Sequence, residues 1–148
     1  MNSVTVTDWG MDWAWGLPLI LLIVVIHAYC LGLLNKEVSA KLINTRRLWR
    51  FSSFSISVIG GTALSATILH GIEGLIWAGA YRILGALPDI KTAMLYSLSA
   101  MTSYGHADLY LAPRWQLMGA LEALNGMILF GLTTAFLFTV LQKAWSQT

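Results

Sequence analysis

A short polar segment between two apolar stretches carries the residues with the clearest chemical potential. It combines hydroxyl groups, a glycine, an imidazole and a carboxylate, in the order Thr102, Ser103, Tyr104, Gly105, His106, Ala107 and Asp108. Hydroxyl and backbone carbonyl oxygens are the groups that replace the hydration shell of a cation in a narrow pore. Glycine and aspartate are equally typical of a plain turn, so the segment by itself leaves a cation pathway and a turn both open.

Three further candidates lie in the apolar run that follows. Glu122 would lie about 10 Å along a helix that begins near Trp115. A carboxylate at that depth in a membrane faces a cavity or a partner. We favour a hydrogen bond from the preceding short segment over a cavity-facing position. Asn125 and Gly126 follow one turn later on the same side, and Gly126 either acts as a hinge or allows close packing.

The histidines and the cysteine offer less. His70 and Glu73 are one turn apart, and we expect a hydrogen-bonded pair, because two ligands are too few for zinc. His27 has no evident partner in its own run, so we expect another helix to supply one. Cys30 is the only cysteine, which excludes a disulfide within one chain. His106 would titrate near pH 6.5 if it faced water; a neutral, hydrogen-bonded position is the equal alternative.

No arrangement in the sequence indicates catalysis. There is no serine, histidine and aspartate order that can be placed, no phosphate-binding loop and no run with metal-ligand spacing. We therefore expect no enzymatic activity and no bound cofactor. The basic residues gather in one loop and the net charge is only +2, which argues against nucleic acid as a partner.

Composition places the chain in a lipid bilayer. Hydrophobic residues make up 57% of its 148 residues and charged residues 11%, against about 25% charged in soluble domains. Mean hydropathy is +0.67. Apolar runs extend from about Trp15 to Leu34, Phe54 to Tyr81 and Trp115 to Leu141, and each is long enough to cross a bilayer as a helix.

The loop Asn35–Ser53 predicts the orientation of these runs. It holds five basic residues against Glu37 alone: Lys36, Lys41, Arg46, Arg47 and Arg50. An excess of Lys and Arg marks a cytoplasmic loop, so we expect the N-terminus outside and the C-terminus in the cytoplasm. Small residues recur at every fourth position from Ser53 to Ser65, a ridge that predicts close helix–helix approach.

The stretch Leu84–Arg114 predicts a helix that does not cross the membrane. Pro88 and Asp89 are typical of a helix start. Ile90–Met101 is apolar at helical spacing but too short to span, so we expect a re-entrant segment that enters and leaves on the outside. Its negative C-terminal end would stabilise a cation at mid-membrane. A surface amphipathic helix followed by an ordinary loop is the alternative.

This stretch resembles a known family. The run from Ala93 to Thr102, A-M-L-Y-S-L-S-A-M-T, is similar to the pore helix of the bacterial two-transmembrane potassium channel superfamily. The residues His70, Glu73, Trp77, Ala78 and Tyr81 resemble its outer helix, and the run from Gly119 to Gly126 its inner helix. The resemblance covers roughly Phe54 to Trp145 and implies a homotetrameric pore with a re-entrant pore helix and filter loop between two spans. The first apolar run is an addition to that plan, so we expect an all-α integral membrane protein with three transmembrane helices and the pore loop between the second and third. Residues 54–148 would form the pore domain, and residues 1–53 the N-terminal tail, an extra span and a cytoplasmic loop.

The filter departs from the family pattern. Thr102 matches the family's first threonine and Asp108 its acidic residue at the mouth. If the filter is aligned on Thr102, its two glycine positions fall on Tyr104 and His106. If Tyr104 and Gly105 are aligned with the family's Tyr-Gly pair instead, one residue is missing and only one glycine remains. The resemblance therefore implies a channel of the bacterial inner membrane that passes monovalent cations such as K+ or Na+ with weak potassium selectivity. A non-conducting membrane scaffold or sensor subunit with the same fold is the alternative.

Overall fold

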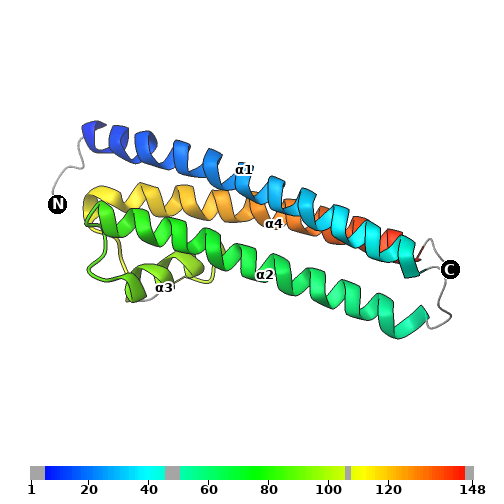
Figure 1. Cartoon of the computed structure of the whole chain (residues 1–148). Helices are drawn as coiled ribbons and strands as arrows, with labels where there is room; N and C mark the ends of the chain where they lie inside the picture. Colours follow the sequence, from blue (N-terminus) through cyan, green and yellow to red (C-terminus); the bar gives the residue numbers. More distant parts are fainter. Residues whose placement is uncertain (1–5, 46–50, 106–107, 146–148) are drawn as a thin grey trace.

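The computed structural model describes residues 6–45, 51–105 and 108–145. This part of the chain is helical and contains no strand. Its elements are α1 (Val6–Thr45), α2 (Phe51–Ile83), α3 (Ile90–Met101), the short 3-10 helix η1 (Pro113–Trp115) and α4 (Gln116–Trp145). The three long helices run side by side, and α3 lies against α2 and α4 at the end of the molecule nearest the N-terminus (Figure 1).

All three long helices can cross a membrane by length and composition. The candidate membrane spans are Trp9–Ala40, Ile56–Ile83 and Pro113–Trp145, with 32, 28 and 33 residues. Large apolar side chains cover their outer faces, among them Leu21, Leu64 and Phe138. Such faces are suited to lipid, so the fold is that of a multi-pass membrane protein, as the composition predicts.

The first helix is longer than the apolar pattern predicts. Helix α1 begins at Val6 and continues to Thr45, so much of the predicted loop Asn35–Ser53 is helical. The fall in hydropathy after Leu34 indicates where the helix would leave the bilayer, whereas helix formers such as Glu37 and Lys41 continue the helix beyond that point. The basic residues Arg46, Arg47 and Arg50 lie outside the described residues.

Helix α3 has the bounds that the sequence predicts. Asp89 is its N-cap: the side chain accepts a hydrogen bond of 2.9 Å from the Thr92 backbone N–H. The buried face consists of Ala93, Ser97, Ser99 and Met101. This face packs on α2 and α4, so the short helix is part of the bundle.

Two glycines of α4 allow α3 to approach closely. A side chain at Gly126 would overlap the Met101 backbone, whose Cα lies 2.7 Å from the ideal Cβ position. A side chain at Gly119 would overlap the ring of Tyr96. The C-terminal end of α3 therefore lies directly on α4 at Gly126, where only glycine leaves enough space.

The connections around α3 are held at the end of the bundle. The Ala112 N–H donates to the Ala86 carbonyl at 3.2 Å, and the Arg82 guanidinium donates to the Leu87 carbonyl at 2.9 Å. The segments before and after α3 thus meet at the same end of the bundle. The chain leaves this end of the bundle along α3 and is back at the same end before α4 begins.

Candidate functional site

The segment after α3 begins as a capped helix end. Thr102 donates its hydroxyl to the Leu98 carbonyl at 2.7 Å, and the Tyr104 N–H donates to the Ser99 carbonyl at 3.0 Å. Ser103 and Gly105 adopt positive φ angles of 55° and 77°. Left-handed residues of this kind commonly end a helix.

The left-handed residues bear on the two alignments of the family filter. Aligned on Thr102, the filter glycines fall on Tyr104 and His106; aligned on Tyr104-Gly105, they fall on Ser103 and Gly105. The positive φ angles lie on Ser103 and Gly105, as in the second alignment. His106 and Ala107 lie outside the described residues. Thr102, Ser103, Tyr104, Gly105 and Asp108 are all exposed on the single chain. The described residues of the predicted filter thus face outward on the single chain and are not packed in the core.

Glu122 joins three helices behind this segment. The carboxyl is fully buried and accepts a hydrogen bond of 2.6 Å from the Tyr81 hydroxyl of α2. Ser97 of α3 is hydrogen-bonded to the other carboxyl oxygen and also contacts the Gly74 carbonyl at 2.9 Å. The sequence left two positions open for Glu122, facing a cavity or hydrogen-bonded to the short segment. The contact with Ser97 of α3 confirms the hydrogen bond.

The Ser97 hydroxyl has one proton and faces two acceptors. It cannot donate to both the Gly74 carbonyl and the Glu122 carboxyl oxygen. A proton on the carboxyl would complete the set, because the carboxyl would donate to Ser97 while Ser97 donates to Gly74. Glu122 is therefore suited to holding α3 in place as a neutral group.

Asn125 and Gly126 lie beside the end of α3. Both are buried in α4, and Gly126 contacts Met101 as described above. The side-chain amide of Asn125 makes no hydrogen bond with any described residue. The close contact at Gly126 fits the packing interpretation, and the hinge interpretation remains a prediction.

A second polar cluster lies near the middle of the three long helices. Glu73 of α2 faces two imidazoles: its Oε1 is 2.8 Å from Nδ1 of His27 in α1, and its Oε2 is 3.2 Å from Nδ1 of His70. The Thr133 hydroxyl of α4 lies on the other side of both rings, 3.0 Å from Nε2 of His27 and 3.1 Å from Nε2 of His70. His27, Glu73 and Thr133 are buried.

This cluster confirms one sequence prediction and adds a residue to another. His27 is satisfied by other helices, as expected. His70 and Glu73 lie in contact as the predicted pair, and His27 joins them as a third potential ligand, with all three ligand atoms within 4.8 Å of one another. The sequence gives no sign of this contact, since His27 and Glu73 are 46 residues apart.

Asp12 is a further buried group that the sequence did not single out. It precedes the apolar run predicted from about Trp15, yet it lies within α1 and is 1% exposed. Its carboxylate accepts a hydrogen bond of 3.0 Å from the Met118 N–H in the first turn of α4. An acidic group at a helix N-terminus satisfies free N–H groups there, so α1 stabilises the start of α4.

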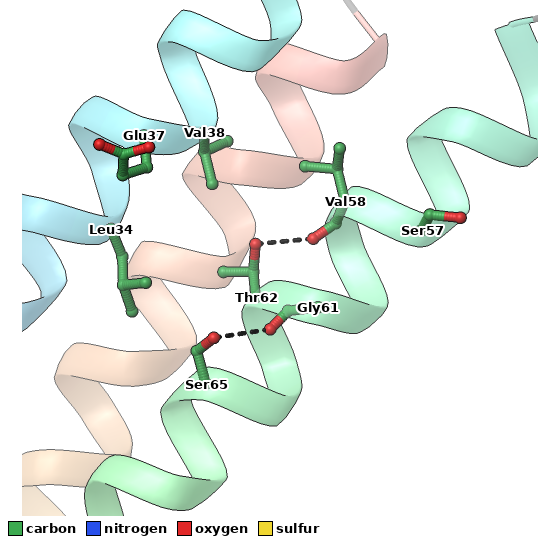
Figure 2. Close-up of a pocket in the computed structure, with 8 residues that line it drawn as sticks. All are labelled: Leu34, Glu37, Val38, Ser57, Val58, Gly61, Thr62 and Ser65. Carbon is green, nitrogen blue, oxygen red and sulfur yellow. Dashed lines mark hydrogen bonds between the residues drawn. The ribbon is translucent and has the colours of Figure 1, made fainter.

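The predicted ridge of small residues faces open space. Ser57, Gly61 and Ser65 line a hollow of ≈ 430 Å³ between α1 and α2, together with Leu34, Glu37, Val38, Val58 and Thr62 (Figure 2). A Cβ added at Gly61 would meet nothing within 4 Å. The close approach predicted for this ridge is therefore not made within the chain, and the Thr62 and Ser65 hydroxyls bond to the carbonyls of their own helix.

Comparison with protein-family models, with curated proteins and with solved structures found no match. The resemblance to the potassium channel superfamily therefore depends on the residues quoted from the sequence alone.

Proposed function

We propose that this chain is one subunit of a pore-loop cation channel, in which copies of α3 and the segment Thr102–Gly105 surround a common axis. The observation that carries the proposal is the location of the end of α3. It lies deep along α4, and the polar segment that follows it is exposed on the single chain.

The depth follows from helix geometry. Gly126, which contacts Met101, is ten residues after Gln116 at the start of α4. At 1.5 Å per residue this is about 15 Å along the helix, close to half of a hydrocarbon core of about 30 Å. The hydrogen bond between Ser97 and Gly74, nine residues before the end of α2, is consistent with this depth.

Exposed backbone at this depth needs a polar environment. Non-helical backbone inside a membrane is tolerated only where protein buries it or where it lines water. A ring of subunits would supply both, with Thr102–Gly105 facing the axis. The negative ends of several α3 helices would point to the same place and favour a cation there. Four copies and weak potassium selectivity come from the resemblance.

The proposal includes a location and an orientation. We place the protein in a bacterial inner membrane as a homotetramer, with the N-terminus outside and the C-terminus in the cytoplasm. The support is the basic excess of residues 35–53. In this orientation α3 enters from the outside.

Ion flux in liposomes tests the function. We expect purified protein to carry K+ and Na+, with reversal potentials in opposed gradients that show a weak preference for K+. Thr102→Val should alter flux or selectivity. Thr134→Val is the matched control, because the hydroxyl of Thr134 also bonds to its own helix, at 2.8 Å from the Phe130 carbonyl, but lies far from α3 in the chain.

Two results would oppose the channel. Folded wild-type protein that carries no current would support the non-conducting scaffold or sensor. A monomer or dimer without a central axis, seen by native mass spectrometry, would leave Thr102–Gly105 without the neighbours that the proposal requires.

A further inference from the structure

We infer that His27, His70 and Glu73 form a binding site for a divalent transition-metal ion of the Zn²⁺ class, which joins α1 to α2 near the middle of the membrane. This site is separate from the segment proposed to line the pore. Thr133 contacts both histidines, so four side chains take part, and together they carry too few protons for all of their contacts.

Four contacts link these side chains in a closed ring. Glu73 contacts Nδ1 of both histidines, and the Thr133 hydroxyl contacts Nε2 of both. Two neutral imidazoles carry one N–H each and Thr133 carries one O–H. Three donors cannot satisfy four contacts. Without a metal, and with both imidazoles neutral, one of the four contacts therefore has no proton to share.

The incomplete contact is visible in the geometry. Among the described residues, neither Nδ1 of His70 nor Oε2 of Glu73 makes a hydrogen bond, although the two atoms are 3.2 Å apart. Both atoms are shielded from solvent, and Glu73 is 0% exposed. Buried polar atoms without a partner are uncommon and call for a missing group.

A metal ion between the Nδ1 atoms and the Glu73 carboxylate completes the ring. Each imidazole then bonds the metal through Nδ1 and carries its proton on Nε2. Both Nε2–H groups can donate to Thr133, whose oxygen has two lone pairs. In a metal-bound histidine, the N–H of the second ring nitrogen regularly donates a hydrogen bond to an oxygen, and this bond fixes the orientation of the imidazole.

The donor set and the spacing fit zinc and its neighbours. Two histidines and one glutamate are an established set of three protein ligands that leaves a fourth position for water. Ligand atoms around tetrahedral zinc lie roughly 3.3 Å apart, given bonds of about 2.0–2.1 Å. The observed separations are 2.8 Å from Nδ1 of His27 to Oε1 of Glu73 and 3.2 Å from Nδ1 of His70 to Oε2. The three ligand atoms all lie within 4.8 Å of one another, so they must draw closer together around the ion.

The experiment measures metal in the full-length protein. The chain is purified through a histidine-free tag, stripped with a chelator and titrated with Zn²⁺ or Co²⁺. We expect one ion per chain by elemental analysis and the visible absorption of tetrahedral Co²⁺. Zn²⁺ should raise the thermal unfolding temperature of the wild type. These wild-type measurements do not depend on the folding of any variant.

Variants then locate the ion. His27→Ala and Glu73→Gln should lose it, while His106→Asn, the third histidine of the chain, should keep it. Thr133→Val should weaken affinity about 10–100-fold through the loss of the shared acceptor, and Thr133→Ser should restore it. No stoichiometric metal in the wild type, or equal binding in His27→Ala, would overturn the inference. Unfolding that responds to pH but not to Zn²⁺ would show that an extra proton, not a metal, completes the ring.

Discussion

Two buried carboxyl groups, Glu122 and Glu73, show how differently the same side chain can be used in one bundle. Both are 0% exposed and lie on helices long enough to span a membrane. Glu122 is surrounded by the hydroxyls of Tyr81 and Ser97. Glu73 is surrounded by the imidazoles of His27 and His70. Each group of contacts is one proton short of completion.

The side chains around each carboxyl determine which group can complete its contacts. Hydroxyl groups are weak metal ligands compared with imidazoles, so at Glu122 the added group is a proton on the carboxyl itself. Imidazole nitrogens accept either a proton or a metal. The contacts of Glu122 therefore join α3 to α2 and α4, whereas the imidazoles around Glu73 can join α1 to α2 through either a proton or the proposed metal ion.

The largest expected effect is at the contact between α3 and α4. Gly126→Val places a side chain into the Met101 backbone, so α3 must move. Overpacking of this kind costs typically about 1–3 kcal/mol and displaces backbone. We expect liposome flux to disappear while stoichiometric metal binding at Glu73 persists.

Gly131→Val is the matched control for this change. It lies on the same helix, and an added Cβ there meets nothing within 4 Å. Flux in Gly131→Val should remain near wild type. Loss of metal binding in Gly126→Val would show that the two carboxyl regions are not independent.

Replacing each buried glutamate with glutamine should leave the function of the Glu122 region intact but remove metal binding at Glu73. Glu122→Gln supplies an amide N–H that can donate to Ser97 and a carbonyl that can accept from Tyr81, so fold and flux should persist. Glu73→Gln likewise completes the metal-free ring, but an amide is a poor zinc ligand, so metal binding should disappear. Unfolding in chelator, metal analysis and flux measure these outcomes.

A non-polar replacement separates hydrogen bonding from packing at Glu122. Glu122→Leu leaves the buried Tyr81 hydroxyl without its acceptor, which costs about 1–3 kcal/mol. Unfolding in detergent should show this loss in Glu122→Leu and not in Glu122→Gln. Equal stability of the two variants would mean that the polar contacts of Glu122 do not hold α3.

A smaller loss is expected from Tyr81→Phe. The ring still packs edge-on against Tyr96, with centroids 5.5 Å apart, and only the hydrogen bond to Glu122 is removed. A single hydrogen bond contributes about 0.5–1.5 kcal/mol, so unfolding should shift by that amount and metal binding should not change. A decrease in metal affinity would again link the two regions.

The two regions also differ in how far the sequence could predict them. The bounds of α3, its cap at Asp89 and the bond between Glu122 and the short segment depend on local pattern and on elements that are neighbours in the chain. The contact of Thr133 with His27 spans 106 residues. Hydropathy shows that both residues belong to membrane helices, but it does not show how each helix is rotated, so the ring could not be found from the sequence.

The smallest expected effect is at the exposed start of α3, where the stabilisation of the helix by Asp89 depends on pH. The Thr92 backbone N–H donates to the Asp89 carboxylate and holds the pKa of Asp89 below its usual value of 3.8. Because the folded-state pKa is lowered, the stabilisation is fully present above that usual value. It is lost as pH falls through the lower, folded-state pKa.

Asp89→Asn tests this signature. Asparagine caps a helix about as well as aspartate and does not titrate, so the variant should lack this part of the acid sensitivity. Hydrogen exchange at the first turn of α3 should therefore accelerate at low pH, beyond the intrinsic pH dependence of exchange, in the wild type and not in Asp89→Asn. Flux at neutral pH should be the same in both proteins, since the end of α3 that contacts Gly126 lies three turns away from Asp89. An identical acid response in the two proteins would show that the cap does not stabilise α3, and that the contacts of Glu122 and Gly126 alone keep the short helix in place.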